Sequence, residues 1–379
     1  MSLVVLTNIP TPYRTAFFDA LAEEAAQAGK SFHVLYCAET EPGRHWPYDA
    51  SKMLHSHTVL GGIHFSMAGL HPHLNFGVVA QLRHLKPDTL IIAGSWNTPT
   101  MLIAGLDIYK PKPRRIFWSE GHVDAARHKS GPIAWMRRWA YQRFDGFAVP
   151  NAKSADWASA QAASAREIFT LPNSIDVDFF TRPSPADRTS LRLRHGLVER
   201  GRVLVQVSAL TARKGVLELA KSFLSLPESA REGAQLVFVG DGELRAELAG
   251  IASSSYKAVV LLGQLPPESV REVLWASDAF VLNTHLDPNP LSAIEAAAAG
   301  LPVVMSARAG NVHEVVEAAN TGFVIPNPSD PSATLRAALS ASDSQLYEMG
   351  VRAARLARDQ FDARAVARAI VSQLYPVAG

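Results

Sequence analysis

Two acidic residues eight positions apart frame the start of a predicted helix in residues 283–304, NTHLDPNPLSAIEAAAAGLPVV. Asp287 lies in a turn rich in Pro and Asn, whereas Glu295 lies one to two turns inside a helix of small residues. An acid among alanines suggests that its carboxylate has a partner. The N–H groups of Leu291 and Ser292 at the helix start would bind an anion. This combination predicts a phosphorylated sugar or a nucleotide as the ligand.

The residues around this helix also predict where it begins and ends. Asn289 is expected to cap the helix, and Pro290 suits the first helical position, where a missing N–H costs nothing. Gly300 is expected to end the helix. Residues 301–305 are then predicted to form a buried strand.

A lysine stands in the loop that follows another predicted strand. Lys214 comes shortly after the apolar run 203–207. Cations and oriented N–H groups stabilise the negative charge of a diphosphate. An isolated loop lysine would be interpreted as solvated, but the motifs that surround this one favour a contact with phosphate.

Polar side chains also follow the first strands of the N-terminal half. Asn8, Thr11 and Arg14 lie in the loop after the predicted strand 2–7. They could contact the phosphates of one substrate or part of a second substrate, and a polar entry to the next helix explains them equally well. Trp96 lies in the loop after the predicted strand 89–93 and belongs to the same candidate site.

Glu120 and His122 follow the next predicted strand, RRIFW. A histidine in such a loop can act in proton transfer, but it is also a common structural hydrogen-bonding residue. Both residues are therefore candidates for the site, and the sequence does not decide which of them faces the substrate.

Two other kinds of site are not supported by the spacing. The turn Gly240-Asp241-Gly242 lacks the third glycine of a dinucleotide fingerprint, since position 245 is Arg. His71 and His73 flank a proline and have no third ligand nearby. We therefore expect neither a nicotinamide cofactor nor a metal ion.

The elements that would position these residues alternate between strand and helix, which is typical of parallel α/β sheets. Residues 1–180 predict one doubly wound domain and residues 181–360 a second. Residues 361–379 predict a C-terminal helix that packs back on the first domain. Residues 39–74 show no clear period and are expected to be variable edge structure, and residues 311–319 predict a helix.

Composition limits the class of protein. The chain has 379 residues, 47% of them hydrophobic and 19% charged, as expected for a globular protein with substantial cores. A formal charge of +2 gives no reason to expect nucleic acid as a partner. The single cysteine, Cys37, fits a reducing compartment. We expect no signal peptide and no membrane span, and hence a cytoplasmic protein that meets a membrane, if at all, at its inner face.

One segment is strongly basic and rich in tryptophan. The segment between Tyr109 and Phe144 contains nine Lys or Arg residues, two acidic residues and three tryptophans. A solvated surface explains this segment as well as contact with anionic lipid headgroups or a lipid diphosphate does. The basic residues are Lys110, Lys112, Arg114, Arg115, Arg127, Lys129, Arg137, Arg138 and Arg143.

Several motifs occur in a fixed order: PNSIDVDFF, R-K-G, V-G-D-G-E, L-G-Q-L, Asp-x7-Glu, G-L-P-V-V and G-N-V-H-E-V-V. In this series the chain resembles the retaining glycosyltransferases of family GT4, over most of its length and best over residues 172–326. The opening NIPTPYR also resembles members that build bacterial surface polysaccharides. The resemblance implies the GT-B fold, in which two Rossmann-like domains face each other across a cleft.

The resemblance also implies roles for individual residues. The C-terminal half would hold a nucleotide sugar, with Lys214 at the diphosphate, Glu295 at the ribose hydroxyls and Asp287 near the sugar. The N-terminal half would hold the acceptor near His122. The implied donor site comprises Ser208, Arg213, Lys214, Gly240, Gly263, Gln264, Leu265, Asn289, Pro290, Leu291, Ser292 and Glu295; Asp287, His122 and Glu120 are the catalytic candidates, and Asn8, Thr11, Arg14 and Trp96 line the N-terminal side.

The sequence departs from the family pattern in three respects. Ser208 and Ala209 stand where the family has Gly-Arg, so that Arg213 would replace the missing cation. Asp287 is shorter than the usual glutamate, and Pro290 replaces a glycine that would offer an N–H.

Together these observations predict a metal-independent, retaining glycosyltransferase that acts on a UDP- or GDP-linked hexose. Its acceptor would be a sugar or a lipid-linked sugar in surface polysaccharide or glycolipid assembly. The alternatives are a non-catalytic sugar-nucleotide-binding subunit and a GT-B sugar-nucleotide epimerase.

Overall fold

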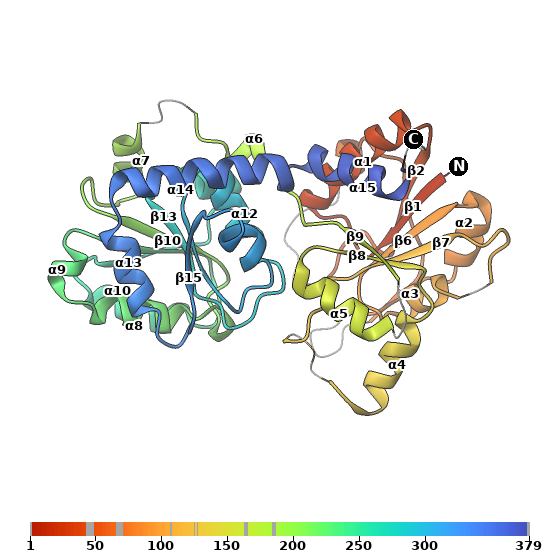
Figure 1. The fold of residues 1–379 in the computed structure, drawn as a ribbon, viewed down its shortest axis with the longest axis horizontal. Coiled ribbons are helices and arrows are strands. Elements are labelled where there is room, and N and C mark those ends of the chain that lie inside the picture. The colour runs from red at the N-terminus through yellow and green to blue at the C-terminus, as the bar shows by residue number, and fades with distance from the viewer. Residues whose placement is uncertain are drawn as a thin grey trace. The chain divides into compact units, whose positions relative to one another are not determined.

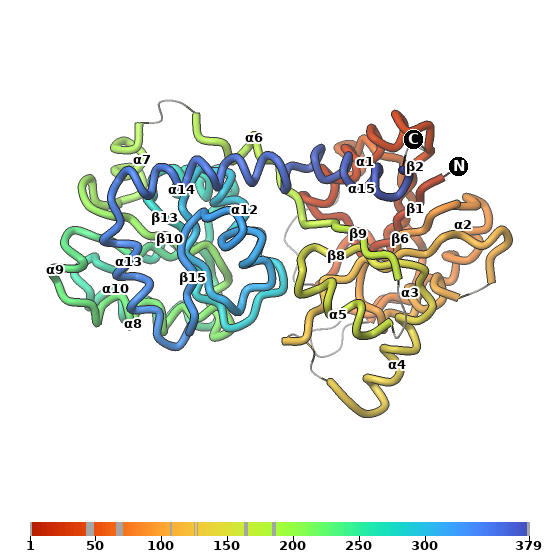
Figure 2. Tube along the Cα trace, in the orientation of Figure 1, coloured from red at the N-terminus to blue at the C-terminus, as the bar shows by residue number. Residues whose placement is uncertain are grey.

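The computed structural model describes residues 2–42, 49–65, 71–106, 108–124, 126, 128–162, 166–183 and 187–376. The chain forms two compact units (Figure 1). The N-terminal unit comprises Met1–Ile175 and Ala363–Gly379, and the C-terminal unit comprises Asp176–Asp362. Figure 2 shows the chain completing the C-terminal unit before it returns to the N-terminal one.

The N-terminal unit is built on a seven-stranded parallel sheet with the order β3-β2-β1-β6-β7-β8-β9. Along β1, Leu3 and Val5 enter one apolar core and Val4 and Leu6 enter the other, because successive side chains of a strand alternate between its faces. The strands are β1 (Ser2–Thr7), β2 (Ser31–Tyr36), β3 (His57–Val59), β6 (Thr89–Ala93), β7 (Arg114–Trp118), β8 (Gly146–Val149) and β9 (Glu167–Thr170).

Helices cover both faces of this sheet. One core is closed by α1 (Pro12–Gln27) and α15 (Ala363–Leu374), which lie side by side in Figure 1. The sequence predicted the same return for residues 361–379. The other core is closed by α2 (Val78–Leu85), α3 (Pro99–Ala104), α4 (Gly131–Tyr141) and α5 (Ala152–Ala162).

The segment expected to be irregular edge structure contains short elements. Besides β3, it includes the 3-10 turn η1 (Ala50–Lys52) and a two-stranded antiparallel sheet of β4 (Ile63–His64) and β5 (His73–Leu74). Residues 43–48 and 66–70 of this segment lie outside the described part of the chain.

The C-terminal unit contains a six-stranded parallel sheet with the order β12-β11-β10-β13-β14-β15. Three successive residues of β10, Val203, Leu204 and Val205, are almost fully buried, as expected for a parallel strand covered on both faces. The strands are β10 (Val203–Val207), β11 (Gln235–Val239), β12 (Val259–Gly263), β13 (Ala279–Leu282), β14 (Val303–Ser306) and β15 (Gly322–Ile325).

The helices of this unit precede, connect and follow its strands. They are α6 (Val177–Phe180), α7 (Arg188–Arg194), α8 (Val216–Ser225), α9 (Glu228–Arg231), α10 (Arg245–Ser254), α11 (Pro267–Ala276), α12 (Leu291–Ala298), α13 (Ser332–Ser340) and α14 (Asp343–Leu356), with a 3-10 turn η2 (Ala212–Lys214) and π-helical turns η3 (His313–Glu317) and η4 (Ala357–Phe361). The helix predicted over residues 311–319 is thus a single π-helical turn.

The strand orders confirm the predicted fold class, which is two doubly wound parallel α/β domains. In each sheet the first strand has its successor on one side and a later strand on the other: β1 lies between β2 and β6, and β10 lies between β11 and β13. Ligands of such sheets bind where the order reverses, at the carboxyl ends of the strands. A ligand site is therefore expected at the loops after β1 and β6 in one unit and at the loops after β10 and β13 in the other.

Candidate functional site

The loops after β10 and β13 pack directly on each other. Gly215 adopts a left-handed φ of +59°, and a Cβ built on it would lie 2.1 Å from the carbonyl oxygen of Asn283. The carbonyl oxygen of Arg213 accepts hydrogen bonds from the Thr284 hydroxyl at 3.0 Å and from the His285 N–H at 2.8 Å. The lysine loop and the acidic turn of the sequence are thereby fixed as one structure.

We expect Gly215→Ala to destabilise the protein by about 2 kcal/mol or more, because the new methyl group meets backbone in a left-handed conformation. Urea unfolding measures this change. Gly250→Ala is the matched control: Gly250 lies inside α10, and a Cβ added there would meet no atom within 4 Å among the described residues. There the substitution should be neutral or stabilising by about 0.5–1 kcal/mol. Equal effects of the two substitutions would contradict the close packing at Gly215.

Lys214 and Asp287 form a nearly buried ion pair. Lys214 is 8% exposed and Asp287 is 9% exposed, and the Lys214 Nζ donates a hydrogen bond to the Asp287 Oδ2. The backbone of Asp287 is held in turn by the loop after β14, since its carbonyl oxygen accepts the Gly310 N–H at 2.8 Å. This third loop contributes to the site and was not predicted as part of it.

The start of α12 differs from the prediction. Pro290 is the N-cap residue, with φ −66° and ψ 114°, and the helix begins at Leu291, so Asn289 is not the cap. The reason lies just upstream, where the Asp287 Oδ1 accepts the Asn289 N–H at 3.3 Å and turns the chain before the proline. Asn289 is left 8% exposed, and neither its Oδ1 nor its Nδ2 has a hydrogen-bond partner among the described residues. A buried amide without partners at a helix start is a candidate ligand contact.

Glu295 lies one turn into α12, on the same side as the partly exposed Leu291, whereas Ala293, Ile294 and Ala296 are buried. Among the described residues its carboxylate makes no hydrogen bond or ion pair. Desolvation raises the pKa of Glu295 to about 7. The sequence predicted a partner for this acid, and the protein itself provides none in the part of the chain that the structure describes.

Three of the predicted donor-site residues meet where β10, β11 and β12 end. The Gly240 N–H donates to the Gly263 carbonyl oxygen at 2.8 Å, and a Cβ on Gly240 would lie 2.0 Å from the Ser208 carbonyl oxygen. The close approach of the Ser208 backbone therefore explains why position 240 is a glycine, without any contact to a ligand. Gln264 is exposed and Leu265 is partly exposed just beyond this crossing.

In the N-terminal unit, Arg14 connects the loops after β1 and β7. Its Nη1 donates to the Thr7 hydroxyl at 2.8 Å, its Nη2 lies 3.6 Å from the Glu120 Oε1, and its guanidinium lies 4.8 Å from the centre of the Trp118 ring. Thr7 and Trp118 were missed in the sequence because both lie at strand ends and have the pattern of core residues.

The loop after β6 meets the same region. A Cβ on Gly94 would lie 2.8 Å from the Asn8 Oδ1, which is buried and has no hydrogen-bond partner within the described ranges. The Thr11 hydroxyl is likewise buried without a partner there. Trp96 packs against the apolar core on that side of the sheet. The structure thus gathers the predicted N-terminal residues at one edge of the sheet.

His122 is the exception. Its side chain has no exposed surface, and its Nδ1 accepts the Asp124 N–H at 3.3 Å. In this structure the ring is therefore not available to a substrate, in contrast to the expectation from the sequence. Glu120, whose side chain is 36% exposed, is the more accessible of the two candidates.

Within the described ranges, no group of three or more His, Cys, Asp or Glu side chains could hold a metal ion. His73 instead contacts Glu41 at 2.9 Å. No helix in the part of the chain that the structure describes is long and apolar enough to traverse a bilayer.

Two parallel α/β domains, each with polar loops at its switch point, define the GT-B class. The structure of HepE from Anabaena in complex with UDP and glucose matches 99% of both chains with a TM-score of 0.72 and 18% sequence identity. The structure of WaaG, a glycosyltransferase involved in lipopolysaccharide biosynthesis, matches 100% of both chains with a TM-score of 0.67 and 20% identity. At these identities the likeness concerns the fold.

The family follows from sequence comparison. Residues 187–358 match the family of glycosyl transferases group 1. The chain is 32% identical over 145 residues to the putative teichuronic acid biosynthesis glycosyltransferase TuaC of Bacillus subtilis, over 38% of this chain and 34% of that protein. It is 32% identical over 164 residues to a GDP-mannose-dependent phosphatidylinositol monomannoside mannosyltransferase of Corynebacterium glutamicum, over 41% of this chain and 42% of that protein.

Residues 187–358, which make up most of the C-terminal unit, therefore match the group 1 glycosyltransferases that the ordered motifs predicted. The chain matches between about a third and two fifths of the length of these curated relatives.

Proposed function

We propose that this protein is a retaining glycosyltransferase that moves a hexosyl unit from a UDP- or GDP-linked donor to a sugar or lipid-linked acceptor in bacterial surface polysaccharide or glycolipid synthesis. The observation that carries the proposal is a group of polar side chains at the β10/β13 switch point, two of which have no hydrogen-bond partner among the described residues. Asn289 and Glu295 both lack side-chain partners among the described residues. Lys214 is held beside them by Asp287.

Each residue has a role that its chemistry permits. Lys214 and the N–H groups of Leu291 and Ser292 would bind the diphosphate and stabilise its charge as the bond to the sugar breaks. The Glu295 carboxylate would accept hydrogen bonds from the ribose hydroxyls. Asp287 would lie near the sugar and exchange its contact with Lys214 for one with the donor.

The named ligands of similar proteins support both donor classes. HepE was solved with UDP and glucose, and the Corynebacterium relative is named as GDP-mannose-dependent. The proposed transfer needs no metal ion, because a lysine and helix N–H groups supply the positive charge that a cation would otherwise provide.

The first experiment is a thermal-shift panel with UDP, GDP and ADP, since a ligand that binds only the folded state raises the melting temperature. The stabilising nucleotide selects the sugar donors for a turnover assay, performed with and without EDTA. Transfer or donor hydrolysis that persists in EDTA supports the proposed enzyme. Tight binding without turnover of any donor supports a non-catalytic subunit, and a changed sugar with free nucleotide in the absence of acceptor supports an epimerase.

We further propose that the protein works at the inner face of the plasma membrane, in contact with anionic lipid through α4. Ile133, Trp135, Met136 and Trp139 of this helix are 42%, 66%, 48% and 38% exposed. The helix carries no acid in its first turn. Exposed apolar side chains with tryptophan and basic neighbours are suited to a membrane interface.

The basic residues of this segment divide into two groups. Arg137 is 6% exposed, donates to the Gln161 Oε1 at 3.1 Å and lies over the Trp157 ring, so it does not contribute to the surface. Arg115 is 2% exposed and donates to the Gly105 carbonyl oxygen. Lys129, Arg138 and Arg143 remain at or near the surface of α4, and Arg127 lies outside the described residues.

We expect the double variant Trp135→Ala/Trp139→Ala to bind vesicles of phosphatidylcholine and phosphatidylglycerol about tenfold more weakly than the wild type. Arg138→Gln should weaken binding about fivefold, and only to vesicles that contain phosphatidylglycerol. Co-sedimentation measures both effects. Tyr256→Ala, which removes a 99% exposed aromatic residue elsewhere, is the control. Unchanged binding of the double variant would refute the α4 contact.

A further inference from the structure

A cavity lies at the amino ends of the strands of the C-terminal sheet. It has a volume of about 780 Å³, which is within the range of small-molecule sites. Its lining includes Arg202, Asp278 and Pro302, which directly precede the amino ends of β10, β13 and β14. The proposed donor site lies at the carboxyl ends of β10 and β13. The two sites are therefore separated by the length of the sheet.

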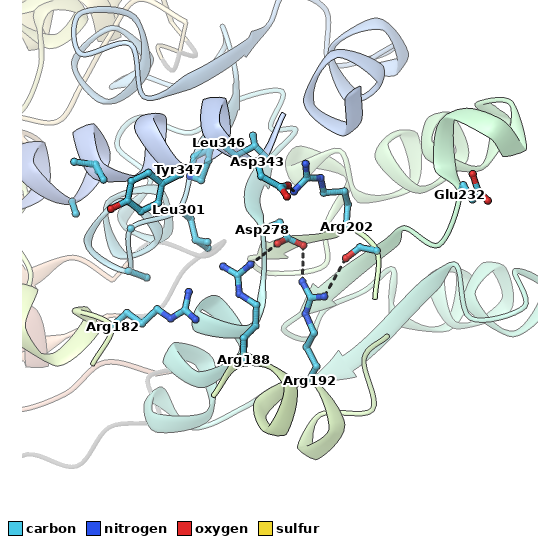
Figure 3. Close-up of a pocket in the computed structure, with 17 residues that line it drawn as sticks. Arg182, Arg188, Arg192, Arg202, Glu232, Asp278, Leu301, Asp343, Leu346 and Tyr347 are labelled. Atoms are coloured by element: carbon cyan, nitrogen blue, oxygen red, sulfur yellow. Dashed lines mark hydrogen bonds and ion pairs between the residues drawn. The ribbon is translucent and has the colours of Figure 1, made fainter. Parts of the chain in front are cut away.

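Positive charge dominates one wall of this cavity. Arg188 and Arg192 lie one turn apart on α7, and both point to Asp278 (Figure 3). The Asp278 Oδ1 accepts the Arg188 Nη1 at 2.7 Å, and its Oδ2 accepts the Arg192 Nη2 at 2.6 Å and the Val203 N–H at 2.7 Å. Arg182 lines the same wall. On this wall Asp278, already shared by three donors, thus faces three guanidinium groups. Asp343, which pairs with Arg202, and Glu232 line the cavity elsewhere.

Arg188 and Arg192 differ in how many of their side-chain N–H groups already donate hydrogen bonds. Arg192 is structural, because its Nε and Nη1 donate to the carbonyl oxygens of Ala276, Glu199 and Gly201. Arg188 is only partly used, since its Nε is buried without a hydrogen-bond partner in the described part of the chain. Burial lowers the pKa of Arg182, and the charges of Arg188 and Arg192 lower it further while Asp278 opposes them, which indicates excess positive charge at this wall.

The wall opposite the arginines is largely apolar. Leu301, Pro302 and Val351 line it, and Tyr347 on α14 is 74% exposed beside them. Figure 3 shows Tyr347 and Leu301 on one side of the cavity and Arg182 and Arg188 on the other. An anionic group and a planar or apolar group therefore both find a matching surface.

We infer that this cavity binds a phosphorylated small molecule, with the phosphate held by Arg182 and Arg188 and the remainder lying against Leu301, Pro302 and Tyr347. Guanidinium groups suit this role because their N–H donors match phosphate oxygens in pairs. The inference does not depend on the identity of the sugar donor.

The test uses phenyl phosphate as the probe, titrated into the full chain by calorimetry with the donor site saturated by the stabilising nucleoside diphosphate. We expect saturable binding, weaker binding of inorganic phosphate, and none of phenol. Arg182→Gln/Arg188→Gln should weaken phenyl phosphate at least about tenfold. Arg336→Gln, which removes an exposed arginine of α13 in the same unit, should change it less than about twofold.

Because Arg188→Gln also removes a contact to Asp278, Arg182→Gln alone is the second variant, and it is titrated below the temperature at which its own melting curve begins. Tyr347→Ala should weaken phenyl phosphate but leave inorganic phosphate unchanged. The inference is overturned if the wild type shows no saturable binding below about 10 mM, or if Arg182→Gln and the folded double variant bind the probe as tightly as the wild type.

Discussion

Glu295→Gln is expected to stabilise the ligand-free protein above pH 7 while weakening its binding of nucleotide. Desolvation raises the pKa of Glu295 to about 7 in the folded state, whereas an unfolded glutamate titrates near 4.3. Between these two values the folded state holds more protons than the unfolded one. Stability therefore falls as pH rises through this window, and the penalty is complete above pH 7.

Glutamine removes the penalty because it never carries the charge. The full pKa difference corresponds to about 4 kcal/mol, and partial exposure of Glu295 reduces the expected gain at pH 8.5 to about 1–2 kcal/mol. The gain should be smaller at pH 5.5, where the carboxyl group is protonated in the folded protein. Calorimetric melting at both pH values measures it, at roughly 2–4 °C for each kcal/mol.

The same substitution should weaken the stabilising nucleoside diphosphate by about tenfold or more at pH 8, because ribose hydroxyls lose a charged acceptor. If the carboxylate is the form that binds, the wild type should itself lose about tenfold in affinity between pH 8 and pH 6. The variant should lose less, since it retains only the titration of the ligand. A variant that binds nucleotide as well as the wild type at both pH values would exclude the ribose role of Glu295.

Lys214→Met should strongly reduce turnover and destabilise the protein. The substitution leaves Asp287 nearly buried without its cation, which costs about 3–5 kcal/mol when such a pair is broken from one side. Loss of the charge at the diphosphate should lower kcat by about 10²–10³-fold. Urea unfolding and the donor-turnover assay measure the two effects.

A double variant separates stability from chemistry. Lys214→Met/Asp287→Leu replaces both charges by apolar side chains and should recover most of the lost stability, because neither partner is left alone. Its turnover should remain as low as that of Lys214→Met. Lys221→Met, at a lysine 62% exposed on α8, controls for charge and should leave both quantities nearly unchanged. Recovery of activity in the double variant would show that Lys214 acts only through Asp287.

The sequence predicted the fold well because its strongest signals are local. The apolar run of β10 and the small-residue helix α12 were predicted from their own residues, and so was the helix at Ala363–Leu374. Strand alternation in both halves then implied two parallel sheets, and that implied loops at the carboxyl ends.

The site was harder to predict where tertiary contacts override local preference. Asn289 is a residue type that often caps helices, but the Asp287 carboxylate accepts its backbone N–H. The helix therefore starts one residue later than predicted. His122 follows a strand as a catalytic residue would, yet its ring is enclosed. The cavity of Arg182, Arg188 and Asp278 could not be predicted from the sequence, because its walls come from segments about 90 residues apart.

The pairing of Lys214 with Asp287 gives the proposed donor site a counter-ion of its own. Binding of a diphosphate is then an exchange of anions at Lys214, in which phosphate oxygens of the donor replace the carboxylate of Asp287. Simple anions such as sulfate should compete poorly. The free energy lost when Asp287 leaves Lys214 is recovered only if the incoming molecule also forms hydrogen bonds with Asn289 and Glu295. We therefore expect the proposed donor site to be selective for a whole nucleotide sugar over free phosphate and salt.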